Sequence, residues 1–228
     1  MIVTEKFAFI HLQKTGGTFV NEFIQRFFSE QQAIGYHFPR RAVPASHRGL
    51  PVLGFVRNPW EFYVSWYVFQ LHSEQSNSLF LIVSENKTLD FNATIGKLLT
   101  LCEDDSLLDE VLATLPQHFV GSGLNLPRAA LAAIRGSELG FYSLLYQWMF
   151  AGEGPLYVGK LETLPEDMIY FLLQSQCTIS PEMRQFLQQE KPRNTTRHQH
   201  YSSYYDETLK QRVAQLEAGL IERYQYRF

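Results

Sequence analysis

The chain has 228 residues, which is enough for one substantial core and predicts a single domain spanning residues 1–228. Apolar residues make up 45% and charged residues 19%, as in ordinary globular proteins. The formal net charge of −3 excludes the general basic field that marks nucleic-acid-binding proteins, so an anion site must come from locally placed cations.

Three further features concern the compartment. Cys102 and Cys177 are too few for a disulfide framework or a zinc-binding spacing, and they fit a reducing environment. The first twelve residues lack the long apolar run of a secretory signal. No apolar stretch approaches the roughly 18 to 20 residues of a membrane span. We therefore expect a cytoplasmic protein without a membrane-spanning segment.

The first quarter of the chain alternates between apolar runs and helical patterns. Short buried strands are predicted at residues 6–12, 33–36 and 51–56. After the first of them, apolar side chains draw one stripe along a helix that begins at Gly17, namely Phe19, Val20, Phe23, Ile24, Phe27 and Phe28. An aromatic-rich helix is expected at residues 59–73, with Pro59 in its first turn.

The remaining elements follow the same alternation. Helix-compatible patterns lie at residues 89–101, 106–115, 127–135 and 140–150. Residues 155–159 predict a further strand, and a helix should begin near Glu162. Asp206 is expected to cap a final helix that reaches about Tyr224. Between these helices, a cluster of acidic residues at 103–110 predicts a solvated face.

Strands that alternate with helices favour an α/β fold with a central parallel sheet flanked by helices. Ligands of such sheets bind beyond the carboxyl ends of the strands. Lys14, His37, Arg57 and Lys160 each follow or end one of the predicted strands. We therefore expect these four side chains to share one edge of the sheet.

The first strand ends in the sequence QKTGGT, which predicts an anion cradle. Gly16 and Gly17 let a ligand approach the backbone, and the start of the next helix offers unsatisfied amide groups and a positive dipole end. Thr15 and Thr18 add hydroxyl groups, and Lys14 adds a full charge. The alternative interpretation is an ordinary strand–turn–helix unit with a surface lysine.

A nucleotide-triphosphate loop of the form G-x-x-x-x-G-K-[ST] does not fit this segment. The lysine precedes the glycines here, and no predicted strand ends in an aspartate suited to magnesium. We therefore expect no metal, although a metal-dependent nucleotide kinase stays an alternative to be tested.

Three ordered segments of the chain are IHLQKTGGTFV, FVRNPWEFYVSWY and RNTTRHQHYSSYYDETL. Together they resemble the sulfotransferases that use 3′-phosphoadenosine 5′-phosphosulfate (PAPS). IHLQKTGGTFV is similar to the 5′-phosphosulfate loop of the carbohydrate-type group, which usually reads P-K-T-G-G-T. FVRNPWEFYVSWY resembles their second signature, in which a serine lies eight positions after the arginine, as Ser65 follows Arg57. RNTTRHQHYSSYYDETL resembles the loop and helix that close over the nucleotide. Gln13 departs from the family's usual proline, and Phe62 from its frequent arginine.

The resemblance implies a P-loop-like three-layer fold and PAPS as the sulfuryl donor. Lys14 would neutralise the oxygen that bridges phosphorus and sulfur, and the amides of Thr15, Gly16, Gly17 and Thr18 would hold the 5′-phosphate. Arg57 and Ser65 would bind the 3′-phosphate, because a guanidinium forms paired, charge-assisted hydrogen bonds with phosphate. The acceptor would be a small molecule or carbohydrate with a hydroxyl or amine group.

The base that removes the acceptor's proton is expected to be a histidine. His37 is our choice because it follows the second predicted strand and because family members often place the base there. His47 competes with it, and His11 and His118 are weaker candidates.

Basic residues gather in two segments without acids. From Gln31 to Trp60 the arginines are Arg40, Arg41, Arg48 and Arg57. From Lys191 to Tyr205 we expect Arg193, Thr195 and Thr196 to contact the 3′-phosphate side, with Arg197 and His198 as alternatives. We interpret both segments as positive charge around the nucleotide.

Residues 75–150 match none of these segments and are expected to form a helical substrate-binding insertion. The sequence leaves the acceptor and the oligomeric state open. A non-catalytic nucleotide-binding protein is a third hypothesis, beside the sulfotransferase and the kinase.

Overall fold

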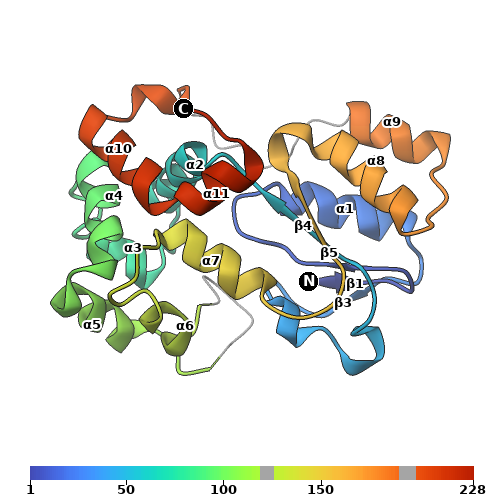
Figure 1. Ribbon diagram of the computed structural model, residues 1–228, viewed down its shortest axis with the longest axis horizontal. Coiled ribbons are helices and arrows are strands. Elements are labelled where there is room, and N and C mark those ends of the chain that lie inside the picture. The colour runs from blue at the N-terminus through green and yellow to red at the C-terminus, as the bar shows by residue number, and fades with distance from the viewer. Residues whose placement is uncertain (119–125, 190–198) are drawn as a thin grey trace. The chain divides into compact units, whose positions relative to one another are not determined.

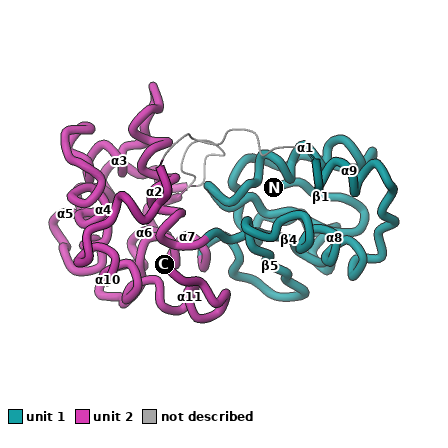
Figure 2. Tube along the Cα trace, turned by 90° about the horizontal axis from the view of Figure 1, so that it is seen from above, with its two compact units in different colours: residues 1–57, 148–195 teal, residues 58–147, 196–228 magenta. Residues whose placement is uncertain are grey.

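The computed structural model describes residues 1–118, 126–189 and 199–228 (Figure 1). The chain forms two compact units (Figure 2). Unit 1 consists of residues 1–57 and 148–195, and unit 2 of residues 58–147 and 196–228. Within the described ranges, no helix is both long enough and apolar enough to cross a membrane.

A five-stranded sheet in the order β3-β1-β2-β4-β5 lies at the centre of unit 1. The strands are β1 (Ile2–Val3), β2 (Ala8–Phe9), β3 (Gln32–Ala33), β4 (Val52–Val56) and β5 (Leu156–Lys160). β2, β4 and β5 pair in parallel. β1 pairs antiparallel with both β2 and β3, so β3 runs in the same direction as the parallel strands. The predicted α/β class is confirmed, but the sheet is mixed rather than purely parallel.

The reversed strand β1 arises from a tight turn between Thr4 and Phe7. The amide of Thr4 donates to the carbonyl of Phe7 at 2.8 Å, and the Thr4 hydroxyl oxygen accepts from the amide of Phe7 at 3.0 Å. These bonds fold residues 2–3 back onto residues 8–9 as a hairpin. The strands expected at residues 6–12 and 33–36 were predicted from longer apolar runs, whereas β1 is two residues long and carries no periodicity of its own.

Three helices cover one face of the sheet in unit 1 (Figure 1). They are α1 (Gly17–Phe27), α8 (Leu164–Gln174) and α9 (Pro181–Gln189). Their buried side chains form one core with the strand residues Phe9, Leu53 and Phe55. Burial of each such side chain contributes roughly 1.5–3 kcal/mol to folding. The core therefore fixes the end of β2 and the start of α1 relative to each other.

Gly54 lies on the opposite face of β4 from its neighbours Leu53 and Phe55. A Cβ atom on Gly54 would lie 2.2 Å from the ring of Phe150, the last residue of α7 (Phe141–Phe150). The missing side chain thus lets an aromatic ring pack directly on the strand. All residues of β4 are buried, as in a strand that is covered on both faces.

The regular elements of unit 2 are all helices in the described residues. Besides most of α7, it contains α2 (Pro59–His72), α3 (Ser78–Val83), α4 (Phe91–Leu99), α5 (Asp105–Thr114), α6 (Arg128–Ala132), α10 (Glu207–Leu216) and α11 (Ala218–Tyr224). Side chains of Asn58, Asn77, Asp90, Asp104 and Asp206 accept amide hydrogen bonds at helix starts, as N-caps do. The helices expected within residues 75–150 are present, and their role toward a substrate stays a prediction.

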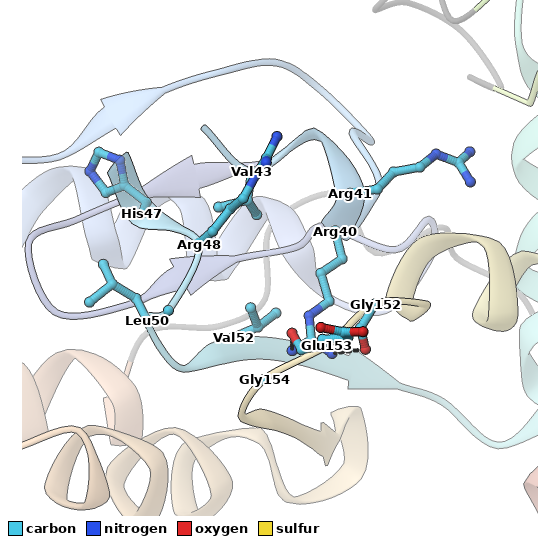
Figure 3. Close-up of a pocket in the computed structure, with 11 residues that line it drawn as sticks. Arg40, Arg41, Val43, His47, Arg48, Leu50, Val52, Gly152, Glu153 and Gly154 are labelled. Atoms are coloured by element: carbon cyan, nitrogen blue, oxygen red, sulfur yellow. Dashed lines mark hydrogen bonds between the residues drawn. The ribbon is translucent and has the colours of Figure 1, made fainter. Parts of the chain in front are cut away.

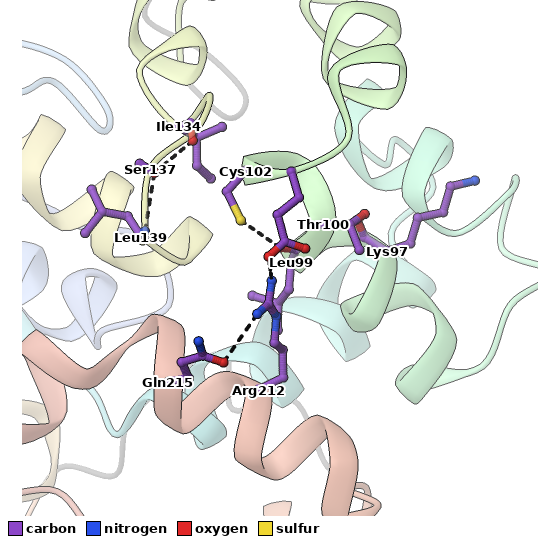
Figure 4. A network of polar contacts seen from close by, with 10 residues as sticks. Lys97, Leu99, Thr100, Cys102, Ile134, Ser137, Leu139, Arg212 and Gln215 are labelled. Carbon is purple, nitrogen blue, oxygen red and sulfur yellow. Dashed lines mark hydrogen bonds and ion pairs between the residues drawn. The ribbon is translucent and has the colours of Figure 1, made fainter.

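The acidic segment at residues 103–110 lies on an exposed face, as predicted, and is bound by arginines. Arg135 forms ion pairs with Asp105 and Asp109, and Arg212 of α10 pairs with Glu103. Figure 4 shows Arg212 reaching from α10 and also donating to Gln215, at 3.3 Å. Exposed ion pairs of this kind each contribute little to stability.

Glu217 is a fully buried carboxylate that separates α10 from α11. It accepts hydrogen bonds from the amide and hydroxyl groups of Ser143, the amide of Tyr142 and the hydroxyl of Tyr63. Gly140 leaves room for it, since a Cβ there would lie 2.1 Å from Oε1. Glu217 therefore binds the amino end of α7, and the predicted single final helix is two helices that meet at this residue.

Candidate functional site

The turn between β2 and α1 has the backbone that an anion cradle requires. Lys14 and Gly16 adopt left-handed conformations, with φ values of 61° and 79°. A Cβ atom on Gly16 would also lie 2.6 Å from Leu161, so glycine is required there for both conformation and space. Glycine at position 16 therefore permits both the turn and the close packing of Leu161 against it.

The amino end of α1 offers donors in the same place. Gly16 is the N-cap residue and supplies no side-chain cap, and the first turn carries no acidic residue. Within the described residues, the amides of Gly16, Gly17 and Thr18 donate no hydrogen bond. These donors and the positive end of the helix dipole together suit an anion. The Thr15 hydroxyl is engaged elsewhere, because it donates to the Leu12 carbonyl at 2.9 Å.

Lys14 and Arg57 lie close enough for their charges to interact. Lys14 follows β2 and Arg57 follows β4, the parallel neighbour of β2, so both lie at the same edge of the sheet. Burial and, to a smaller extent, the positive charge of Arg57 together lower the pKa of Lys14 to about 8. Two neighbouring cations that disfavour each other would both be stabilised by a multiply charged anion.

His37 lies at this edge because β3 runs in the direction of β2. Its Nδ1 atom lies 2.9 Å from the carbonyl oxygen of His11. A carbonyl oxygen only accepts, so Nδ1 carries the proton and Nε2 keeps a lone pair. Burial lowers the pKa of His37 to about 4, and the charge of Lys14 contributes in the same direction. The imidazole is therefore neutral near pH 7 and can accept a proton at Nε2.

The competing histidines have different surroundings. His11 is buried against the start of α1: its ring occupies the space that a Cβ on Gly17 would need, at 1.8 Å, and its Nδ1 lies 3.5 Å from the side-chain amide of Asn21. Burial also lowers the pKa of His11 well below its usual value. His47 contacts Ser46 and lines a pocket away from this edge, and His118 is exposed in unit 2. His37 stays the preferred base.

The role of the His11 carbonyl was missed from the sequence. His11 and His37 are 26 positions apart, and no local pattern links them. Their rings also contact each other, with centroids 4.5 Å apart. Only the pairing of β3 and β2 through β1 brings the two residues together.

Arg57 and Ser65 occupy adjacent elements of the chain. Arg57 is half-buried at the end of β4, in unit 1. Asn58 and Pro59 then start α2, with the Asn58 side chain accepting from the amide of Trp60 at 3.0 Å. Ser65 is buried on α2, in unit 2. Its contact with a 3′-phosphate stays a prediction.

The structure describes only some of the other residues that the sequence predicted for the site. Arg193, Thr195 and Thr196 lie outside the described residues, as do Arg197 and His198. Lys160 ends β5 at the cradle's edge of the sheet, as expected. Within the described part of the chain, no group of three or more His, Cys, Asp or Glu side chains could hold a metal ion.

The interpretation of the first basic segment is wrong for three of its arginines. Arg40, Arg41 and Arg48 line a pocket together with Val52, the first residue of β4, whereas Arg57 follows the last residue of that strand. Strand β4 rises by roughly 3.3 Å per residue, so these arginines lie at the opposite edge of the sheet from Arg57. A sequence window without acids groups residues by position and cannot show which end of a strand they occupy.

Comparisons with known proteins add no identification, because no family model matches the chain and no curated protein matches it.

Proposed function

We propose that this protein is a sulfotransferase that moves a sulfuryl group from PAPS to a hydroxyl or amine acceptor. The observation that carries the proposal is the meeting of Lys14 and Arg57 at the carboxyl ends of neighbouring parallel strands, beside the uncapped start of α1. A doubly phosphorylated nucleotide with a sulfate group is a multiply charged anion, which cationic side chains and free amides can bind. The strand–turn–helix unit and the parallel β2-β4-β5 order also support a P-loop-like three-layer architecture.

Each residue of the proposed site has its own role in the reaction. The amides of Gly16, Gly17 and Thr18 hold the 5′-phosphate, and Arg57 holds the 3′-phosphate. Lys14 neutralises the charge that grows on the oxygen bridging phosphorus and sulfur. His37 takes the acceptor's proton at Nε2 while the acceptor oxygen forms its bond to sulfur and the bridging oxygen leaves with adenosine 3′,5′-bisphosphate. A transferred sulfuryl group carries less negative charge than a phosphoryl group, so cationic side chains and amides replace a metal in this scheme.

The test is transfer of radiolabelled sulfate from PAPS to a panel of carbohydrates, phenols, alcohols and amines. We expect a labelled product with one acceptor class and a rate lowered about 10²- to 10⁴-fold by His37→Gln. His47→Gln is the matched control and should leave the rate unchanged. Magnesium-dependent turnover of ATP would favour the kinase. Binding of adenosine 3′,5′-bisphosphate without any transfer would favour a non-catalytic binding protein.

A further inference from the structure

A pocket of about 520 Å³ lies in unit 1 at the amino ends of β4 and β5. Its walls come from the segment 40–50, the loop Gly152–Gly154 and Val52 (Figure 3). Lys14 and Arg57 lie beyond the carboxyl ends of the strands, so the pocket and the nucleotide cradle share no residue and lie at opposite edges of the sheet. This size is ordinary for a site that holds a small organic molecule.

Arg40 places a buried positive charge at this pocket. It is 7% exposed, and its guanidinium donates to the carbonyl oxygens of Gly152 at 3.2 Å, Glu153 at 2.5 Å and Pro155 at 3.3 Å. Figure 3 shows the side chain pointing toward the first two of these residues. These acceptors are neutral, and no carboxylate in the described parts of the chain forms an ion pair with Arg40. Buried charges are normally paired with an opposite charge, whereas this guanidinium donates to backbone carbonyl groups.

The other cations at the pocket also form no ion pair among the described residues. Arg48 is exposed at the pocket, and Nδ1 of His47 lies 2.9 Å from the hydroxyl oxygen of Ser46. Arg41 points away from Gly152 and Glu153 in Figure 3, and its guanidinium lies 3.1 Å from the ring centroid of Trp148. Glu153 supplies the one carboxylate among the residues that line the pocket. Positive charge therefore exceeds negative charge at the pocket.

The remaining wall is apolar and consists of Val43, Leu50 and Val52. We propose that this pocket is a second binding site, for a small organic anion whose sulfate, phosphate or carboxylate group faces Arg40 and Arg48. The apolar body of the ligand packs on Val43, Leu50 and Val52. The proposal stands apart from the sulfotransferase function, because it needs neither Lys14 nor Arg57.

Isothermal titration of the full chain with naphthalene-2-sulfonate tests the site, since this probe carries one anionic group on an apolar body. We expect saturable binding whose Kd rises about tenfold or more in Arg48→Gln, the loss of one charge-assisted hydrogen bond. Arg48 is exposed, so its replacement leaves the fold intact. Arg26→Gln, which removes an arginine from α1 on the same unit, should not change the Kd.

The Lys14→Ala variant distinguishes binding of the probe in the pocket from binding in the proposed nucleotide cradle. The probe should bind this variant as tightly as it binds the unchanged protein, and adenosine 3′,5′-bisphosphate should not compete with it. Absence of saturable binding, an unchanged Kd in Arg48→Gln, or loss of binding in Lys14→Ala would each overturn the proposal. The last outcome would mean that the probe occupies the nucleotide cradle instead.

Discussion

The Nδ1 atom of His37 donates a hydrogen bond to the carbonyl oxygen of His11 over 2.9 Å. The His11 ring in turn rests on Gly17, the first residue of α1. One short chain of contacts thus joins the proposed base to the helix start that would hold the 5′-phosphate. A substitution at Gly17 should therefore also change the position of His37.

Gly17→Ala is expected to destabilise the protein by about 1–3 kcal/mol, because the new Cβ would lie 1.8 Å from the His11 ring and force it to move. Gly219→Ala in α11 is the matched control, since a Cβ there meets nothing within 4 Å. That replacement should stabilise the protein by about 0.5–1 kcal/mol. Urea unfolding of both variants measures the difference. Equal changes in the free energy of unfolding of the two variants would show that the His11 ring can move without a loss of stability.

Binding of adenosine 3′,5′-bisphosphate should weaken as the pH rises above about 8. Lys14, whose pKa burial lowers to about 8, loses its positive charge in that range and with it an attraction for the anion. Lys14→Arg should remove this alkaline decline, because a guanidinium stays protonated. Titration calorimetry from pH 6.5 to 9.5 provides the test. The same decline in both proteins would assign the titration to another group.

Glu217 should make the protein less stable as the pH rises. Burial raises its pKa from 4.5 to about 7, so the folded state binds more protons than the unfolded state between these values. Its contribution is fully present below pH 4.5 and is lost as the pH passes through 7, by on the order of 3 kcal/mol.

Glu217→Gln isolates this effect, since it removes the titration and keeps the shape. His11 and His37 act in the opposite sense, because burial lowers both pKa values and stability then falls as the pH drops below 6.5. The informative quantity is therefore the difference in unfolding free energy between the two proteins. This difference should shift in favour of Glu217→Gln from pH 5 to pH 8. A constant difference would contradict the assignment.

The position of Lys14 and Arg57 at one edge of the sheet was predictable from the sequence, because each of them comes at the end of an apolar run. Lys14 and Arg57 end the two most regular strand patterns, and the parallel pairing of β2 with β4 then places them together. The uncapped start of α1 was equally readable from Gly16 and Gly17. These inferences need only local pattern and the direction of the strands.

The remainder depends on contacts that the sequence does not encode locally. The β1 strand depends on a turn at Thr4, and the orientation of His37 depends on a carbonyl 26 residues away. Arg40 was assigned to the nucleotide, yet its side chain binds carbonyls of the loop before β5. Long side chains can point to either end of a strand, so charge in a sequence window does not locate a site.

The most direct test of the central claim is thermal stabilisation by adenosine 3′,5′-bisphosphate, compared in Arg57→Ala and Arg48→Ala. At a nucleotide concentration about 100 times the Kd, the unchanged protein should gain about 2.7 kcal/mol and a higher Tm. Arg48→Ala should keep this shift, and Arg57→Ala should lose most of it. No shift in the unchanged protein, or an undiminished shift in Arg57→Ala, would contradict the account.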